Sequence, residues 1–287
     1  MSYSPAIMAD LSQLSYAARD VRRFDRDRFS TVLFAPEARR EALFALYAFN
    51  SEIARVREQV NEPMFGRIRL QWWRDTLGGL YSGQQGADHP TAAALAEIIA
   101  AHSLSKAHFD HLINAREQDL EVGPPETYAA LEDYTAASSA CLQLLALELL
   151  DASDELSRQA ARHVGIAWAL TGLLRSTAHM AGSGRVMLPL DMLDQHGVDL
   201  DDLLNGKSSP GLQALAKEMA GRIQEHLGQA RRQNVRRSAI PALLCASLAD
   251  GYLSRLGKAG YDLMDTRWSM PQPRPLRLAW KSLTGGF

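Results

Sequence analysis

His108 and His111 are the residues whose type and spacing most directly suggest metal chemistry. An i, i+3 spacing places two imidazoles on one face of a helix, where they could bind zinc. A zinc site needs further ligands in a matching geometry, and no third or fourth ligand is evident beside this pair. Motifs for dinucleotide binding, phosphate-binding loops, zinc proteases, CxxC redox pairs and hydrolase nucleophiles are also missing from the sequence. We therefore expect an ordinary solvated helix face at the two histidines.

Arg175 is a second residue that could take part in binding or chemistry, because it directly follows an apolar run that extends from Val164 to Leu174. An unpaired charge beside such a run would be costly. A partner is therefore expected, either an acid such as Glu58 or a bound anion. A structural ion pair and a ligand contact both remain open for this arginine.

The composition is that of a globular protein without a nucleic-acid-binding charge. The chain has 287 residues, 46% hydrophobic and 22% charged, and its formal net charge is -2. This balance argues against nucleic acid as a partner. The two cysteines, Cys141 and Cys245, lie in apolar runs, which favours buried thiols in a reducing compartment over a disulfide framework.

The expected location is cytoplasmic, and a peripheral position at the inner membrane stays open. The N-terminal region contains Asp10, Asp20, Asp25 and Asp27 and lacks a basic segment followed by an apolar block, which disfavours a signal or transit peptide. The run from Val164 to Leu174 is well short of the roughly 20 residues that a transmembrane helix needs.

Helical periodicity recurs along the chain, and Pro, Ser, Thr and Gly stand where helix ends are expected. The fold class is therefore all-α. The predicted helices cover residues 36–60, 63–81, 90–101, 105–121, 127–150, 153–180, 189–197, 210–236 and 240–265. The Val164 to Leu174 run is apolar on every side, so this part of its helix is expected at the centre of the fold. We predict one helical domain over 1–266, followed by a tail over 267–287.

The predicted tail is basic and contains two tryptophans. It carries Arg267, Arg274, Arg277 and Lys281 with no acid, together with Trp268 and Trp280. Basic residues interleaved with Trp and Leu favour an anionic membrane surface or a partner protein. The alternative is a tail packed on the body with its charges in water.

Four segments carry a resemblance to a known family: RFSTVLFAPEARREALFALYAFN (28–50), RLQWWRD (69–75), VGIAWALTGLLRS (164–176) and GRVMLPLDMLDQHGV (184–198). In this order they resemble the squalene/phytoene synthase family of head-to-head prenyl synthases. The resemblance implies a single-domain, all-helical isoprenoid-synthase fold.

The sequence departs from this family where the family binds metal. Active members carry two Asp-xxx-Asp motifs on facing helices, and these bind the Mg²⁺ ions that hold a prenyl diphosphate. The corresponding positions here are Ala54 and Glu58 in the first motif and Ser176 and Met180 in the second. Mg²⁺ prefers carboxylate and phosphate oxygens, so one acid of four leaves the ions without fixed protein ligands. Arg175 matches an arginine that active members keep.

A narrower resemblance comes from YAFNSEIARVREQVNEP (47–63) followed by RLQWWRD. This string is similar to the phytoene-synthase-like assembly factors of respiratory complex I, which lack the metal-binding motif. That resemblance implies a non-catalytic role in complex I biogenesis at a membrane.

The leading hypothesis is a catalytically degenerate family member without catalytic residues, metal or cofactor. It would bind a complex I subunit or assembly intermediate, or an isoprenoid or lipid in the family's apolar cavity. The residues expected to line the former metal end are Asn50, Ala54, Glu58, Arg175, Ser176 and Met180. Asn50 is expected to hydrogen-bond within the fold, and Trp72, Trp73 and Trp168 are expected in the core.

The rival hypothesis is an active prenyl transferase that condenses farnesyl or geranylgeranyl diphosphate with Mg²⁺ as cofactor. It would use other acids, for example Glu52, Glu58 or Asp119.

Overall fold

The computed structural model describes residues 14–84, 88–121, 123–272 and 274–287, and every regular element in them is helical. The helices are α1 (Tyr16–Phe24), α2 (Arg26–Val32), α3 (Glu37–Ala54), η3 (Arg57–Gln59), α4 (Pro63–Tyr81), α5 (Pro90–Ala101), α6 (Lys106–Gln118), α7 (Tyr128–Thr135), η4 (Ala136–Ala140), α8 (Cys141–Leu149), α9 (Glu155–Gly182), α10 (Leu190–Gln195), α11 (Leu200–Leu204), α12 (Pro210–Arg231), η5 (Arg237–Ala239), α13 (Ile240–Leu243), α14 (Cys245–Lys258) and α15 (Pro275–Thr284).

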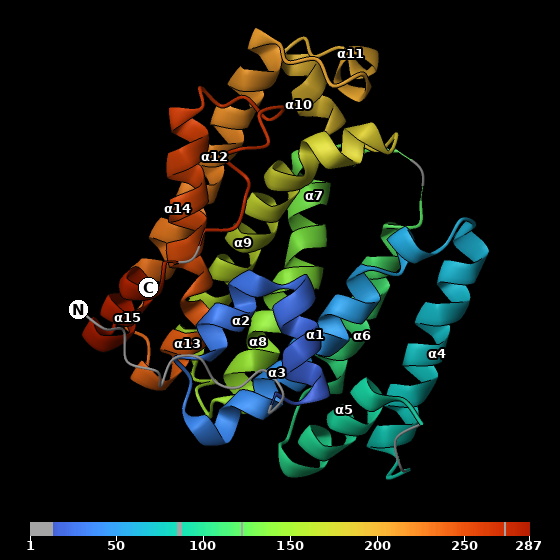
Figure 1. Ribbon diagram of the computed structural model, residues 1–287, viewed down its shortest axis with the longest axis vertical. Coiled ribbons are helices and arrows are strands. Elements are labelled where there is room, and N and C mark those ends of the chain that lie inside the picture. The colour runs from blue at the N-terminus through green and yellow to red at the C-terminus, as the bar shows by residue number, and fades with distance from the viewer. Residues whose placement is uncertain (1–13, 85–87, 122, 273) are drawn as a thin grey trace.

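The long helix α9 forms the middle of the bundle, as its apolar sequence predicts. Asp154 caps its start, because the Asp154 carboxylate accepts hydrogen bonds from both the backbone N–H and the hydroxyl of Ser157. The helix packs against α8, α12, α14 and η4. Figure 1 shows α12 and α14 on one side of α9 and α4 to α6 on the other.

Gly165 of α9 allows a close approach to η4, a π-helical turn that interrupts the predicted helix over 127–150. A Cβ atom at Gly165 would lie 2.4 Å from the Ala140 Cα and 2.7 Å from the Ala140 backbone nitrogen. Backbone atoms cannot move aside as a flexible side chain can. The contact between α9 and η4 therefore depends on the missing side chain.

Proline fixes three helix starts at the residues expected from the sequence, Pro63 in α4, Pro90 in α5 and Pro210 in α12. Several predicted ends need correction, and the helix expected over 210–236 ends at Arg231. The helix expected over 36–60 breaks after Ala54, and only a 3₁₀ turn follows it. The helix expected over 240–265 is divided into α13 and α14 and ends at Lys258.

Four further helices were not expected from the sequence: α1, α2, α11 and α15. Asp25 joins the first two, since it follows the last residue of α1 and its carboxylate accepts a hydrogen bond from the Arg28 backbone N–H at the start of α2. In the tail, α15 buries Leu278 and leaves Trp280 largely exposed, while Phe287 is also buried. The division of the chain at residue 266 stays a prediction.

Both cysteines are buried and free, as expected from their apolar surroundings. The prediction of a solvated helix face at His108 and His111 is only partly correct. His111 is exposed, but His108 is half-buried beside Glu148, and burial lowers its pKa.

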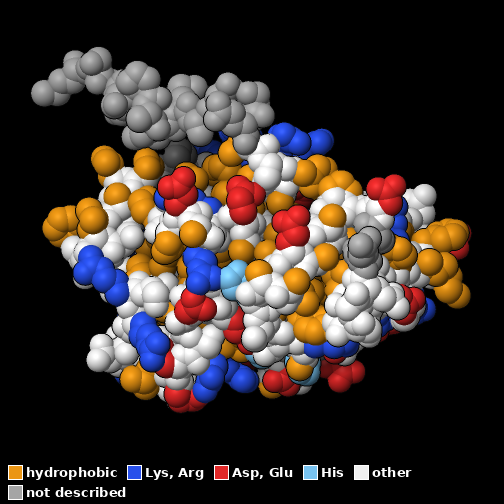
Figure 2. Space-filling view, turned by 90° about the horizontal axis from the view of Figure 1, so that it is seen from below, with side chains coloured by type: hydrophobic (Ala, Val, Ile, Leu, Met, Phe, Trp, Pro, Cys, Tyr) orange, Lys and Arg blue, Asp and Glu red, His pale blue; other side chains and the backbone are white. Residues whose placement is uncertain are grey.

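The face of the molecule seen in Figure 2 mixes hydrophobic side chains with charges of both signs. None of the helices in the described parts of the chain combines the length and apolar character that crossing a bilayer requires.

A histidine pair between α9 and α12 predicts a loss of stability in mild acid. The Nδ1 atoms of His163 and His226 lie 3.0 Å apart, and burial together with His226 lowers the pKa of His163. The ordinary pKa of a histidine is 6.5. Below this pH the unfolded chain binds a proton at His163 that the folded chain does not bind, so the free energy of unfolding decreases as the pH is lowered.

Urea unfolding between pH 7.5 and 5.5 measures this effect. We expect His163→Gln to reduce the fall, whereas the same change at the exposed His179 should leave it intact. An equal fall in the wild type and in His163→Gln would contradict the prediction.

Candidate functional site

The α3 end of the predicted site contains one buried residue and two more accessible ones. Asn50 is buried, and its Oδ1 atom has no hydrogen-bond partner among the described residues, contrary to the expectation that its amide would be satisfied. Ala54 is half-buried at the last position of α3, and Glu58 is exposed on η3. The only acid retained from the two family motifs therefore lies in solvent.

The α9 end of the predicted site is occupied by local contacts. The Ser176 hydroxyl donates to the Leu173 carbonyl oxygen at 3.1 Å and lies 3.5 Å from the Met180 Sδ. Within the described residues, no hydrogen bond or ion pair links Asn50, Ala54 or Glu58 to these α9 positions. The structure thus gives no polar network across the former metal end.

Arg175 has an acidic partner, but the partner is Asp27 of α2 and not Glu58. The Arg175 Nη1 and Asp27 Oδ2 atoms are 3.0 Å apart, and the Tyr252 hydroxyl donates to the same Oδ2 at 2.8 Å. The Arg175 guanidinium also lies 3.7 Å from the centre of the Tyr252 ring. Glu58 was the wrong choice because η3 points it into water, whereas α2 brings Asp27 next to α9.

The same arginine borders a cavity of about 390 Å³ between the α1–α2 turn and α9. Arg23 and Arg26 also line this cavity, together with Asp25 and Asp27. The structural ion pair expected at Arg175 is thus present, whereas a ligand contact in the cavity beside it stays a prediction.

Arg28 is a buried site residue that the sequence did not single out. Its guanidinium lies 5.5 Å from the centre of the Tyr47 ring of α3 and 6.0 Å from that of Trp168 of α9. Its Nη1 atom is 2.7 Å from the Asp25 Oδ2. Arg28 is thus a paired cation held between the two helices that carry the degenerate motifs. In the sequence it stands in an Arg- and Asp-rich run, which is more typical of a solvated surface.

The residues present do not fit the metal cluster that the family uses. Ala54, Ser176 and Met180 offer no carboxylate, and Glu58 is exposed. In the described ranges, no group of three His, Cys, Asp or Glu side chains is placed to hold a metal ion. We therefore derive no reaction step through Mg²⁺.

The rival acids lie in separate places and contact other groups. Asp119 is bound by Arg116 at 3.2 Å and by the Tyr134 hydroxyl at 2.8 Å. Glu52 accepts a hydrogen bond from the Thr91 hydroxyl and lies 3.4 Å from the His89 Nε2. These acids do not converge on a common point.

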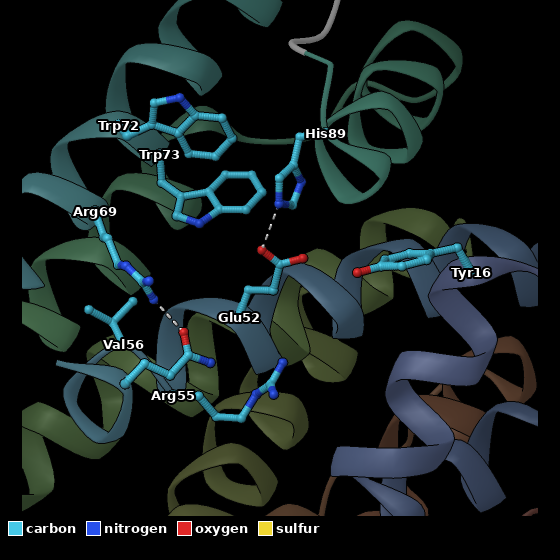
Figure 3. Close-up of a pocket in the computed structure, with 9 residues that line it drawn as sticks. Tyr16, Glu52, Arg55, Val56, Arg69, Trp72, Trp73 and His89 are labelled. Atoms are coloured by element: carbon cyan, nitrogen blue, oxygen red, sulfur yellow. Dashed lines mark hydrogen bonds and ion pairs between the residues drawn. The ribbon is translucent and has the colours of Figure 1, made fainter.

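Glu52 lines a cavity of about 360 Å³ between α1, α3, α4 and the start of α5, shown in Figure 3. Trp72 and Trp73 form another side of it. Trp73 is buried, as is Trp168 in the core, but the prediction for Trp72 is wrong because 39% of this residue is exposed. Burial raises the pKa of the Glu52 carboxyl, with the Thr91 hydrogen bond and His89 acting in the opposite direction. The sequence signals were the Trp pair and Glu52, but nothing in their spacing placed them together.

Comparison with known proteins agrees with this architecture. A profile of the squalene/phytoene synthase family matches residues 21–277. NADH dehydrogenase (ubiquinone) complex I, assembly factor 6, from Bos taurus is 29% identical over 86% of this chain and 75% of its own length. A presqualene diphosphate synthase from Rhodopseudomonas palustris is 26% identical over 70% of this chain and 72% of its own.

A crystal structure of a dehydrosqualene synthase in complex with ligand superposes with a TM-score of 0.80 at 19% identity, covering 94% of both chains. The predicted all-α isoprenoid-synthase fold is thereby confirmed. Since the family profile spans nearly all of the described helices, the chain belongs to the squalene/phytoene synthase family.

Proposed function

We propose that this protein acts in the biogenesis of respiratory complex I by binding a subunit or an assembly intermediate, without prenyl-transfer chemistry and without a metal cofactor. The observation that carries the proposal is the loss of carboxylates at Ala54, Ser176 and Met180, with Glu58 left in solvent. The similarity to complex I assembly factor 6 supplies the kind of partner.

Partner binding is favoured over an isoprenoid ligand in the interior because of Arg28. A prenyl chain between α3 and α9 would have to pack against a buried guanidinium and its Asp25 partner. Apolar chains do not compensate such charges. The proposed working surface is therefore outside the bundle.

Two measurements on the full chain test the proposal. We expect no sustained release of diphosphate from farnesyl or geranylgeranyl diphosphate with Mg²⁺, under conditions where a presqualene diphosphate synthase turns over. We also expect deletion of the gene to lower the amount of assembled complex I on native gels, and the wild-type chain to restore it. Formation of a C30 or C40 product would overturn the non-enzymatic function and support the prenyl transferase.

We further propose that the protein works in the cytoplasm, peripherally at the inner membrane, with α15 as the membrane contact. Leu276, Trp280 and Leu283 recur at i, i+4 and i+7 and are 86%, 68% and 71% exposed. Lys281 lies on the same helix, as does Arg277, which pairs with Asp250 of α14 at 3.0 Å. An apolar stripe beside basic residues suits an anionic lipid surface.

Vesicle binding by point variants tests this contact. Deleting the tail would also remove the buried Trp268 and Phe287, so substitutions are the cleaner change. We expect Leu276→Ser with Trp280→Ser to weaken binding to phosphatidylglycerol vesicles at low salt by at least about fivefold. Ile68→Ser on α4, an exposed residue far from α15 in the sequence, is the matched control. Equal binding by the double variant and the wild type would remove α15 as the contact.

A further inference from the structure

The cavity of Figure 3 lies on a different face of α3 from the degenerate motif, because Glu52 is two residues, and so about 200° of helix rotation, from both Asn50 and Ala54. Its lining comes from α1, α3, η3, α4 and the residue before α5. The prenyl-synthase resemblance gives no ligand for this cavity, although its RLQWWRD segment contains Arg69, Trp72 and Trp73. The ligand of this cavity must therefore be inferred from the side chains that line it.

One part of the cavity is an acid surrounded by aromatic rings. The Glu52 carboxylate is held by Thr91 and His89, and its side chain is only 16% exposed. The His89 ring lies 5.3 Å from the Trp72 ring and 5.5 Å from the Trp73 ring, measured between centroids. Tyr16 faces the carboxylate from another side (Figure 3). A half-buried carboxylate within aromatic faces is a site for a cationic group.

Another part of the cavity is basic. Arg69 bonds only to the Gln59 side-chain amide oxygen among the described residues. Its neighbours on α4 differ, since Arg67 pairs with Glu121 at 2.7 Å and Arg74 with Glu117 at 2.8 Å. A guanidinium without a carboxylate partner, at the edge of a cavity, suits a carboxylate or phosphate group of a ligand.

We propose that this cavity binds a small zwitterion, with its ammonium group toward Glu52 and the rings and its phosphate or carboxylate toward Arg69. Arg55 also lines the cavity, but Asp20 pairs with it at 3.7 Å. A simple anion would meet the Glu52 charge and a simple cation would meet Arg69, whereas a ligand with both charges can pair with Glu52 and Arg69 together. Phosphoethanolamine has this chemistry, either as a free metabolite or as a lipid headgroup. The inference is independent of the proposed role in complex I biogenesis.

Isothermal titration of the full chain with O-phosphoethanolamine is the direct test. We expect saturable binding at least about tenfold tighter than that of ethanolamine or inorganic phosphate, because each of these lacks one of the two charged groups. No saturable binding of O-phosphoethanolamine would overturn the proposal. Equal affinity for inorganic phosphate would also overturn it, since that result describes a plain anion site.

Two variants and one control assign the binding to the cavity. Glu52→Gln and Arg69→Gln should each weaken O-phosphoethanolamine binding by about tenfold or more, whereas Arg67→Gln should leave it unchanged. If Glu52→Gln fails to fold by circular dichroism, the exposed Arg69 still decides the question. Equal losses at Arg67 and Arg69 would contradict the site.

Flotation with phosphatidylethanolamine vesicles separates the two sources of the ligand. Vesicle binding that Arg69→Gln reduces identifies a lipid headgroup, and binding of the free compound alone identifies a soluble metabolite. Both outcomes support the zwitterion site.

Discussion

Replacing Arg28 with alanine is expected to lower the free energy of unfolding by about 3–5 kcal/mol, the usual consequence of removing one partner of a buried ion pair. Arg28 is 6% exposed and its Nη1 atom lies 2.7 Å from Asp25. Its loss leaves the Asp25 carboxylate without its cation and opens a void between Tyr47 and Trp168. Both effects destabilise the fold.

Urea denaturation followed by circular dichroism measures this change. Arg67→Ala is the matched control, because the Arg67–Glu121 pair is largely in solvent and its removal should change the stability far less. Arg28→Met separates charge from volume. It refills most of the void, so a loss as large as that of alanine would assign the effect to the ion pair. A loss below about 1 kcal/mol in both variants would show that Arg28 is dispensable.

Replacing Gly165 with alanine is expected to cost about 1–3 kcal/mol, the range for forcing extra atoms into a packed interior. The added Cβ would lie 2.4 Å from the Ala140 Cα, so α9 and η4 must separate. Alanine is the better helix former, and helix propensity alone would predict the opposite sign. The sign of the change therefore tests the close approach directly.

Gly172 provides the control on the same helix, because a Cβ atom there would meet nothing within 4 Å. Gly172→Ala is expected to stabilise the protein by up to about 1 kcal/mol through helix propensity. Thermal unfolding of the two variants gives both signs in one experiment. Stabilisation by Gly165→Ala would mean that the two helices are farther apart than described.

The fold could be predicted from the sequence because its determinants are local or shared with a family. Pro63 and Pro90 set helix starts, and the apolar run from Val164 to Leu174 placed α9 at the centre. The motif positions at Ala54 and Ser176 rest on the family resemblance and stay a prediction.

The contacts of the site could not be predicted because they join residues distant in sequence. Arg175 meets Asp27 across 148 positions, and no local pattern distinguishes Asp27 from the other acids of its run. Likewise, Trp72 and Trp73 are neighbours with the same side chain and line the same cavity, yet Trp73 is buried and Trp72 is 39% exposed. Which of them is buried depends on how α5 packs beside α4, and this is a tertiary property.

The guanidinium between Tyr47 and Trp168 also limits how the chain could be re-engineered. Introducing aspartates at positions 54, 176 and 180 would supply oxygen ligands, but it would leave the Arg28–Asp25 ion pair between the two helices where a prenyl chain would have to pack. Deleting the guanidinium alone would cost the scaffold much of its stability. A return to prenyl diphosphate ionisation would therefore need two steps in a fixed order. Arg28 and Asp25 would first be exchanged together for apolar residues, and the metal ligands would be restored afterwards. The first step alone would give no gain in turnover.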